Sequence, residues 1–179
     1  MGLLSQTSKP EMNMFDLRLF CLRLLGFVCL VGSSLGVSAQ LATQDLDWKE
    51  SDTPTPPAFS PNKLLPLDMP PYVSLRFGID PATLTITTDG IVRYVVVATN
   101  ASGSVSALYE GIRCATGEVK TYARASGAGA WSIIQAPEWR GLNDNQPSKH
   151  AWVFARQAAC DGRAAAASSA ADIIRAMRK

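Results

Sequence analysis

The chain contains very little histidine, and His150 is the only residue of this type. A zinc site built on imidazoles needs two or three of them, so the sequence excludes a histidine-based metal centre. After residue 39 no serine stands in a Gly-x-Ser-x-Gly elbow, and the aspartates lack the spacing of a calcium loop. Gly127-x-Gly129 lacks the preceding strand and following helix of a dinucleotide-binding motif. We therefore expect no cofactor, and the sequence names no catalytic residue.

An excess of one sign of charge is also absent. The 179 residues include 17 basic and 15 acidic side chains, which gives a formal net charge of +2. This balance is too small to favour nucleic acid or an anionic membrane surface as a partner. We expect no nucleic-acid partner.

Long apolar runs are missing as well, and the longest, at residues 24–31, is too short for a comfortable membrane span. It follows the basic residues Lys9, Arg18 and Arg23 and precedes the small-residue cleavage site Val37-Ser38-Ala39. This order is typical of a secretory signal peptide. We predict a signal peptide at residues 1–39, cut near Ala39, and no transmembrane span in the mature chain. An uncleaved anchor is the alternative, and translation can begin at Met1, Met12 or Met14.

Cysteine becomes scarce after the predicted cleavage site, where only Cys114 and Cys160 remain. Exported proteins with two cysteines usually pair them, so we predict a Cys114–Cys160 disulfide. The chain-entropy treatment gives such a cross-link a stabilisation of about 4 kcal/mol. Two buried free thiols are the alternative.

Proline is concentrated in residues 40–71, which carry seven of the 11 prolines and predict an extended arm. The half that begins at Phe59 is rich in leucine, so we expect it to lie across the domain. The first half is acidic, and we expect it to be mobile. Its acidic residues are Asp45, Asp47, Glu50 and Asp52.

From Tyr72 onward apolar and polar residues alternate with a period of two, which predicts strands. The expected strands are residues 72–77, 83–87, 91–99, 105–114, 119–125 and 131–134. Residues 91–99 are apolar on both faces, which predicts a central strand covered on both sides. Asp89-Gly90, just before this strand, predicts a two-residue type I′ hairpin.

Two helices are expected after the strands. Ser148 and Gly162 are candidate caps of the first, with four residues on one face: Trp152, Ala155, Arg156 and Ala159. The second is expected at residues 164–178, with an apolar stripe of Ala170, Ile173, Ile174 and Met177. Strands followed by helices predict an α+β fold: an antiparallel β-meander of about six strands with C-terminal helices packed on it. We assign this single domain to residues 72–179.

Tyr109-Glu110-Gly111-Ile112-Arg113-Cys114 combines an aromatic residue, a glycine, both signs of charge and a cysteine. Alternation places Glu110 on the face of Leu108, Ile112 and Cys114, where a carboxylate needs a partner. A β-bulge at Gly111 would bring Arg113 beside Glu110. A structural ion pair and a functional carboxylate both remain open. With a second acid, Glu110 could hydrolyse glycosides, but the sequence does not identify that acid.

Other candidates for binding lie near the C-terminal helices. Trp139-Arg140 stands in an irregular segment, and both residue types are enriched at interface hot spots. We expect Trp152 and Trp131 to belong to the core, although indoles can also line a ligand groove. We expect His150 to be a surface residue near the start of the first helix.

The chain resembles a known family in the order of several motifs: Trp48-Lys49-Glu50 before the proline-rich arm, Val92-Arg93-Tyr94, the hexapeptide at residues 109–114, Tyr122-Ala123, Trp131, Glu138-Trp139-Arg140 and a helix that ends at Cys160. These are similar to the CNP1-like family, which takes its name from a cryptic neisserial protein. The resemblance covers most of residues 46–177 and implies an exported envelope protein of a Gram-negative bacterium, hence the periplasm. It implies no catalytic residue, because the family has no established activity. The alanine-rich tail after Cys160 departs from the pattern.

We expect a non-catalytic binding or structural module, with an envelope protein or a cell-wall component as its partner. Trp139 and Arg140 are its candidate binding residues, together with Glu110 and Arg113. One alternative is a small enzyme in which Glu110 acts and Arg113 orients it, and this reading requires a pocket beside Glu110. The other is a small-molecule binder lined by tryptophans.

Overall fold

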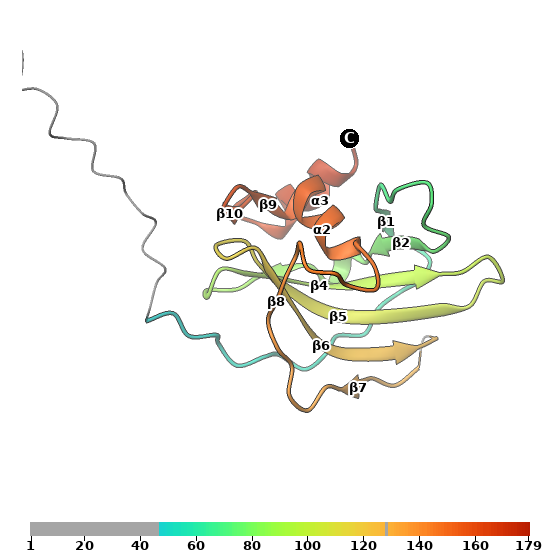
Figure 1. Cartoon of the computed structure of the whole chain (residues 1–179), viewed down its shortest axis with the longest axis horizontal. Helices are drawn as coiled ribbons and strands as arrows, with labels where there is room; N and C mark the ends of the chain where they lie inside the picture. Colours follow the sequence, from blue (N-terminus) through green and yellow to red (C-terminus); the bar gives the residue numbers. More distant parts are fainter. Residues whose placement is uncertain (1–46, 128) are drawn as a thin grey trace, which may run out of the picture. The chain divides into compact units, whose positions relative to one another are not determined.

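The structure is a computed structural model and describes residues 47–127 and 129–179. The predicted signal peptide, its cleavage site and the beginning of the arm lie outside these residues. The predicted α+β fold is confirmed. The described chain forms an antiparallel sheet, and two short helices and a two-stranded hairpin follow it in the sequence (Figure 1).

Three nine-residue strands form the centre of the sheet: β4 (Ile91–Thr99), β5 (Val105–Arg113) and β6 (Glu118–Ser126). They pair in chain order as the predicted meander. Short strands complete the edges, and the path runs β1 (Leu65–Pro66), β2 (Arg76–Ile79), β4, β5, β6, β7 (Ser132–Ile133). In addition, β3 (Thr85–Ile86) pairs with β4, and β8 (Arg140–Gly141) pairs with β6.

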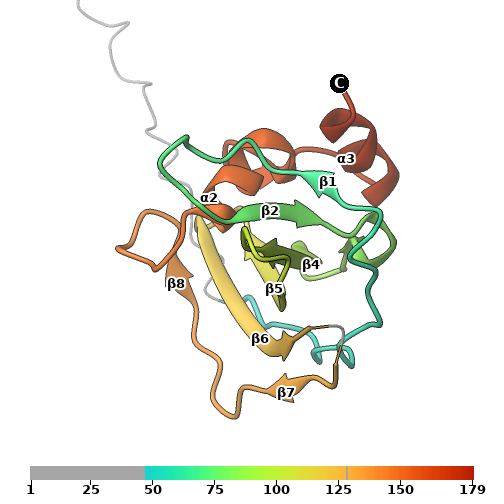
Figure 2. The ribbon, with the colours of Figure 1, turned by 90° about the vertical axis from the view of Figure 1, so that its right-hand side faces the viewer.

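Both faces of β4 are buried, as its sequence predicts. Val92, Tyr94 and Val96 belong to the cluster beneath the helices, whereas Val95 and Val97 belong to a second cluster on the opposite face. Phe59 and Trp131 pack on that second cluster, so the arm and the segment around β7 cover the face that the helices leave open. Figure 2 shows the same layers after a quarter turn.

One strand prediction and one turn prediction need correction on the side of the sheet where β2 and β3 pair with β4. The strand predicted at residues 72–77 begins only at Arg76, and Tyr72 is 83% exposed. The Asp89-Gly90 turn is not type I′, because that turn needs positive φ at both central residues and only Gly90 has it, at 78°. The backbone of Thr87 instead pairs with Ile91 and encloses a three-residue loop.

The C-terminal region differs from the predicted pair of helices. The first helix, α2 (His150–Phe154), follows Lys149 rather than a Ser148 cap and continues as a π-helical turn, η2 (Ala155–Ala159). That turn leaves Arg156 exposed, although we expected it on the buried face with Ala155 and Ala159. Gly162 is not a helix cap: it lies, with φ of 58°, in the hairpin between β9 (Cys160–Asp161) and β10 (Ala164–Ala165).

The last helix, α3 (Ala170–Met177), is shorter than predicted because the hairpin occupies part of its range. Ser169 caps it by accepting a hydrogen bond from the backbone of Asp172. The predicted stripe is confirmed, since Ile173 and Met177 are buried and Ala170 and Ile174 pack against the same cluster.

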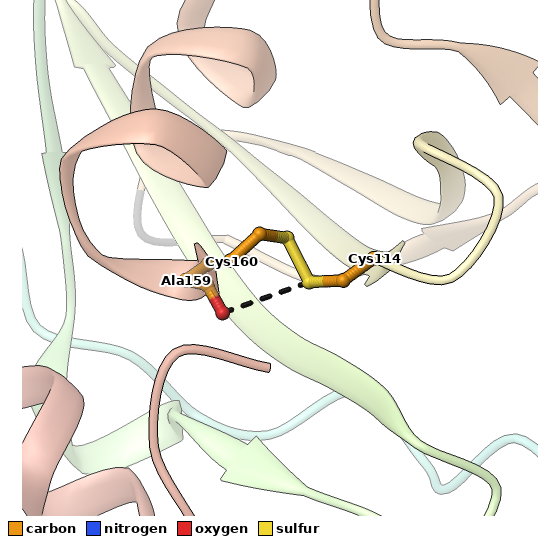
Figure 3. Close-up of a disulfide and its surroundings, with 3 residues drawn as sticks. All are labelled: Cys114, Ala159 and Cys160. Atoms are coloured by element: carbon orange, nitrogen blue, oxygen red, sulfur yellow. Dashed lines mark hydrogen bonds between the residues drawn. A yellow bond between two sulfur atoms is a disulfide. The ribbon is translucent and has the colours of Figure 1, made fainter. Parts of the chain in front are cut away.

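The predicted disulfide joins the chain just after β5 to the end of η2. Cys114 and Cys160 are bonded, with their Cα atoms 5.6 Å apart, and Cys114 Sγ also lies 3.6 Å from the carbonyl oxygen of Ala159 (Figure 3). The cross-link therefore fastens the helical layer to the central strands.

Candidate functional site

Glu110 is a buried carboxylate in the middle of β5, and three side chains hold it. Its side chain is 3% exposed. Tyr94 donates its hydroxyl to Oε2 at 2.9 Å, and Thr121 donates its hydroxyl to Oε1 at 3.0 Å. His150 Nε2 lies 2.8 Å from Oε2. The predicted partner Arg113 is not among these residues, so the expected Glu110–Arg113 pair is wrong.

A β-bulge makes this arrangement possible, but it lies on β6 rather than at Gly111. Tyr109 pairs with Ala123 and Glu110 pairs with Thr121, which leaves Tyr122 as an extra residue. An extra residue shifts the alternation of the side chains that precede it. Thr121 therefore faces Glu110, and Tyr122 joins the cluster on the opposite face. Glu110 keeps the predicted face, together with Ile112 and Cys114.

His150 was expected at the surface, and this prediction is wrong. It is 5% exposed. Its ring stacks on Phe77 with centroids 5.2 Å apart and an angle of 12° between the planes. Nδ1 lies 2.5 Å from the hydroxyl of Ser148, and Nε2 meets Glu110. The first turn of α2 thus places the imidazole between the carboxylate and a hydroxyl, where burial is compensated by hydrogen bonds at both nitrogens.

The environment favours the charged forms of both partners. Burial raises the pKa of Glu110, but the charge of His150 and three side-chain hydrogen bonds outweigh burial and hold this pKa below its ordinary value. Burial lowers the pKa of His150, but the Glu110 carboxylate outweighs burial and raises it. Burial and the same carboxylate raise the pKa of Tyr94 well above its ordinary range, so the phenol keeps its proton and donates.

A cavity of about 360 Å³ opens beside this pair, at the edge where the chain leaves β7 and returns to α2. Glu110, Thr121 and His150 line its inner part, and Arg124, Glu138 and Arg140 are exposed side chains of its lining. The remaining wall is mostly apolar and includes Leu108, Val119, Ile134, Pro137 and Pro147. This volume falls within the range of small-molecule sites.

The geometry limits what the pair can do chemically. Ser148, His150 and Glu110 form a hydroxyl–imidazole–carboxylate chain, which is the set of groups in a nucleophilic triad. In the imidazolium state both ring nitrogens donate, so Ser148 accepts a hydrogen bond and the ring has no lone pair to receive its proton. The arrangement therefore suits a fixed charge pair beside a ligand better than activation of Ser148.

A second polar cluster lies on the opposite face of the sheet, where Glu50 of the arm is the central group. Its carboxylate accepts from Lys120 Nζ at 2.5 Å, from the Tyr122 hydroxyl at 2.7 Å and from Trp139 Nε1 at 3.2 Å. Trp48 stacks on Arg113, whose guanidinium carbon lies 3.5 Å from the ring centroid. The first half of the described arm was expected to be mobile, but these contacts dock it on the sheet.

Beside Glu50, a buried ion pair closes the turn before β4. Arg93 is fully buried, and its Nη2 lies 3.0 Å from Asp89 Oδ2 and 3.7 Å from Glu50 Oε1. Burial raises the pKa of Asp89, but hydrogen bonds from Arg93, Ser51 and Thr87 outweigh it and hold the pKa far below its ordinary value. Asp89 is thus a charged turn residue that positions Arg93 under the arm.

The structure separates the two residues of the predicted Trp139-Arg140 patch. Trp139 contacts Glu50 and packs edge-on to Trp48 with centroids 6.1 Å apart, whereas Arg140 lines the cavity beside Glu110. Trp131 packs on the second cluster and Trp152 on the edge of the first, both half-buried. Sequence reasoning missed His150 and Arg124 as cavity residues, and it missed Glu50 as the centre of a contact network.

The described residues and the comparisons with known proteins give three further findings. In residues 47–127 and 129–179, no three histidine, cysteine, aspartate or glutamate side chains gather in a way that could hold a metal ion. None of the helices in that part of the chain has the length and apolar character needed to cross a membrane. No curated protein and no solved structure matches the chain.

The predicted family resemblance is confirmed. The model of the CNP1-like family matches residues 43–178, which include both clusters and the disulfide. The chain belongs to the CNP1-like family.

Proposed function

We propose that this protein is a non-catalytic binding module of the periplasm and that its ligand occupies the cavity beside Glu110 and His150. The observation that carries the proposal is a cavity of about 360 Å³ whose lining includes Arg124 and Arg140 next to a buried charge pair. Small-molecule sites are usually concave and combine apolar walls with placed polar groups, and this cavity has an apolar wall beside several polar and charged side chains.

The charges of the cavity favour an anionic ligand. With His150 protonated, the state that its raised pKa favours, Glu110 and His150 neutralise each other at 2.8 Å. Within residues 47–127 and 129–179, Arg124 and Arg140 form no ion pair at 4.0 Å or less with an acidic side chain. Glu138 is the other charged side chain of the lining, so the arginines leave a net positive charge. Guanidinium groups bind carboxylates through paired hydrogen bonds.

The walls define the rest of the ligand. Leu108, Val119 and Ile134 offer apolar surface, and Thr121 and Ser148 offer hydroxyls. A small organic carboxylate with an apolar body would bury that body against these walls and direct its charged group toward the arginines. The ligand class that we propose is therefore an amphipathic organic acid of the envelope.

We expect organic acids to bind the purified chain and expect Arg124→Gln/Arg140→Gln to weaken binding at least tenfold, since charged hydrogen bonds contribute about 1.5–3 kcal/mol each. Isothermal titration calorimetry with a panel of short aliphatic and aromatic monocarboxylates measures this. Arg163→Gln is the matched control, because Arg163 is exposed on the β9–β10 turn away from the cavity lining. If no acid binds, or if the double variant binds as wild type does, the cavity is not the site.

The same samples test the enzyme alternative. A protonated His150 has no lone pair with which to activate Ser148, so we expect mass spectrometry to recover each bound acid and its esters unchanged. A product that forms with the wild-type chain and not with Ser148→Ala or Glu110→Gln would replace the binding proposal with a hydrolytic one.

Export is part of the proposal. The bonded Cys114 and Cys160 support it, because disulfides persist in oxidising compartments such as the periplasm. In a Gram-negative host that expresses the full chain, we expect the protein in the periplasmic fraction with Gln40 at its N-terminus. Cell fractionation and intact-mass measurement test this, and a cytoplasmic protein that retains residues 1–39 would contradict it.

A further inference from the structure

The segment Trp48–Ser51 is attached to the sheet by a compact set of polar and aromatic contacts. Trp48 stacks on Arg113 and donates its indole N–H to the carbonyl oxygen of Asp89 at 2.8 Å. The carboxylate of Glu50 accepts hydrogen bonds from Lys120, Tyr122 and Trp139. Ser51 donates its backbone N–H and its hydroxyl to Asp89 Oδ2 at 3.0 and 2.6 Å. Lys49, between the two anchors, is exposed.

These contacts are specific for one sequence pattern, an aromatic residue two positions before a residue that carries a carboxylate. The guanidinium of Arg113 offers a flat cation for an aromatic ring, which is a favourable pairing. Lys120, Tyr122 and Trp139 offer three donors that converge on one carboxylate, with Arg93 Nη2 at 3.7 Å as a further positive charge. We name these five residues, Arg93, Arg113, Lys120, Tyr122 and Trp139, the latch site.

The chain on the C-terminal side of this segment is suited to release. Residues 51–55 are exposed, and Pro54, Pro56 and Pro57 prevent them from joining a strand or helix. A separate anchor follows, in which Trp131 donates to the carbonyl oxygen of Pro57 at 2.9 Å and packs against Phe59. Detaching Trp48 and Glu50 would therefore leave that second, mainly apolar anchor and the core clusters in place.

We propose that residues 48–51 are a releasable latch and that the latch site binds an extended acidic peptide of a partner protein that presents the same aromatic–x–carboxylate pattern. The latch occupies this site until such a peptide displaces it. Because the latch is tethered, its effective concentration is high, and an outside peptide must bind tightly or be locally concentrated to compete. The inference uses the face of the sheet opposite the cavity and does not depend on the proposed ligand there.

The probe is a fluorescein-labelled peptide that carries residues 47–55 of this chain. We expect it to bind the full chain with Trp48→Ala/Glu50→Gln and to bind wild type at least tenfold more weakly, because the latch site of wild type is occupied. Fluorescence anisotropy measures both. A peptide with the same two substitutions is the matched control, and we expect it to bind the open variant at least tenfold more weakly.

Adding Lys120→Ala to the open variant removes one donor, and we expect it to reduce peptide binding severalfold. Thermal melts first establish that each variant is folded, and Glu50→Gln alone is used if the double variant is not. Binding of the native peptide to the open variant, lost in the control peptide, supports the proposal. An open, folded variant that binds neither peptide, or binds both alike, overturns it.

Discussion

Removal of the disulfide is expected to lower the free energy of unfolding by about 4 kcal/mol. Cys114 and Cys160 are 46 positions apart, and the loss of loop-closure entropy in the unfolded chain for a loop of this size gives that value. Domains of this size are stable by about 5–15 kcal/mol, so the loss is a large fraction of the total. Urea denaturation of Cys114→Ala/Cys160→Ala against oxidised wild type measures it.

The cross-link also connects the sheet to the helical segment that carries His150. It ties the end of η2 to the end of β5 (Figure 3), and α2, which carries His150, leads directly into η2. Wild type treated with a reductant should lose as much stability as the double variant, and the double variant should not respond to reductant. A double variant within about 1 kcal/mol of wild type would show that the core alone holds the helical layer.

The sequence was sufficient for those parts of the fold that depend on short-range periodicity. Residues 91–99 are apolar on both faces and the flanking strands alternate between apolar and polar residues, so the central strand β4 and the meander follow from the printed sequence. The disulfide could be predicted from the number of cysteines, because only two remain after residue 39.

The partner of Glu110 could not be read in the same way. It depends on which residue is left out of the β5–β6 ladder, and nothing in residues 118–126 marks Tyr122 as that residue. The bulge determines that Thr121 meets Glu110 and that Tyr122 meets Glu50. A shift of one residue in the β5–β6 pairing determines which side chains surround Glu110 and which surround Glu50. Such a shift depends on how the strands pair in the folded protein and not on the local sequence.

His150 and the arm were misread for a related reason. A lone histidine at a helix start is usually exposed, and here its burial is explained by a carboxylate 40 positions away. Proline content predicted an extended arm, but its attachment depends on cations from three different strands. Basic residues on otherwise apolar strands, Arg93 and Arg113, were the available signal, since a buried cation needs an acidic or aromatic partner.

Disruption of the Glu110–His150 pair is the second large effect that we expect. Glu110→Gln removes the carboxylate from a site where it accepts hydrogen bonds from Tyr94 and Thr121 and faces the buried imidazole of His150. Loss of one partner of a buried charge pair costs about 3–5 kcal/mol, because the remaining charge is left without compensation. Asp172→Asn, which breaks the exposed pair with Arg175, is the control and should change stability by less than about 1 kcal/mol.

The pH dependence of stability distinguishes a charge pair from a neutral hydrogen bond. The pKa of Glu110 is lowered in the folded state, so its contribution is present above its ordinary pKa of 4.5 and is lost as the pH falls through the folded value. The pKa of His150 is raised, so its contribution is complete below 6.5 and is lost as the pH rises through the folded value. The coupling free energy between the two residues should therefore be greatest between about pH 4.5 and 6.5.

A double-mutant cycle with Glu110→Gln, His150→Gln and the double variant measures that coupling, by urea denaturation at pH values from 4 to 9. We expect the coupling free energy to fall on both sides of the maximum, because one partner loses its charge at each end. A coupling that does not vary with pH would show that the pair is held as a neutral hydrogen bond. In that case His150 would have a free lone pair to which Ser148 could donate its hydroxyl proton. The imidazole could then act as the general base that the hydrolytic alternative requires.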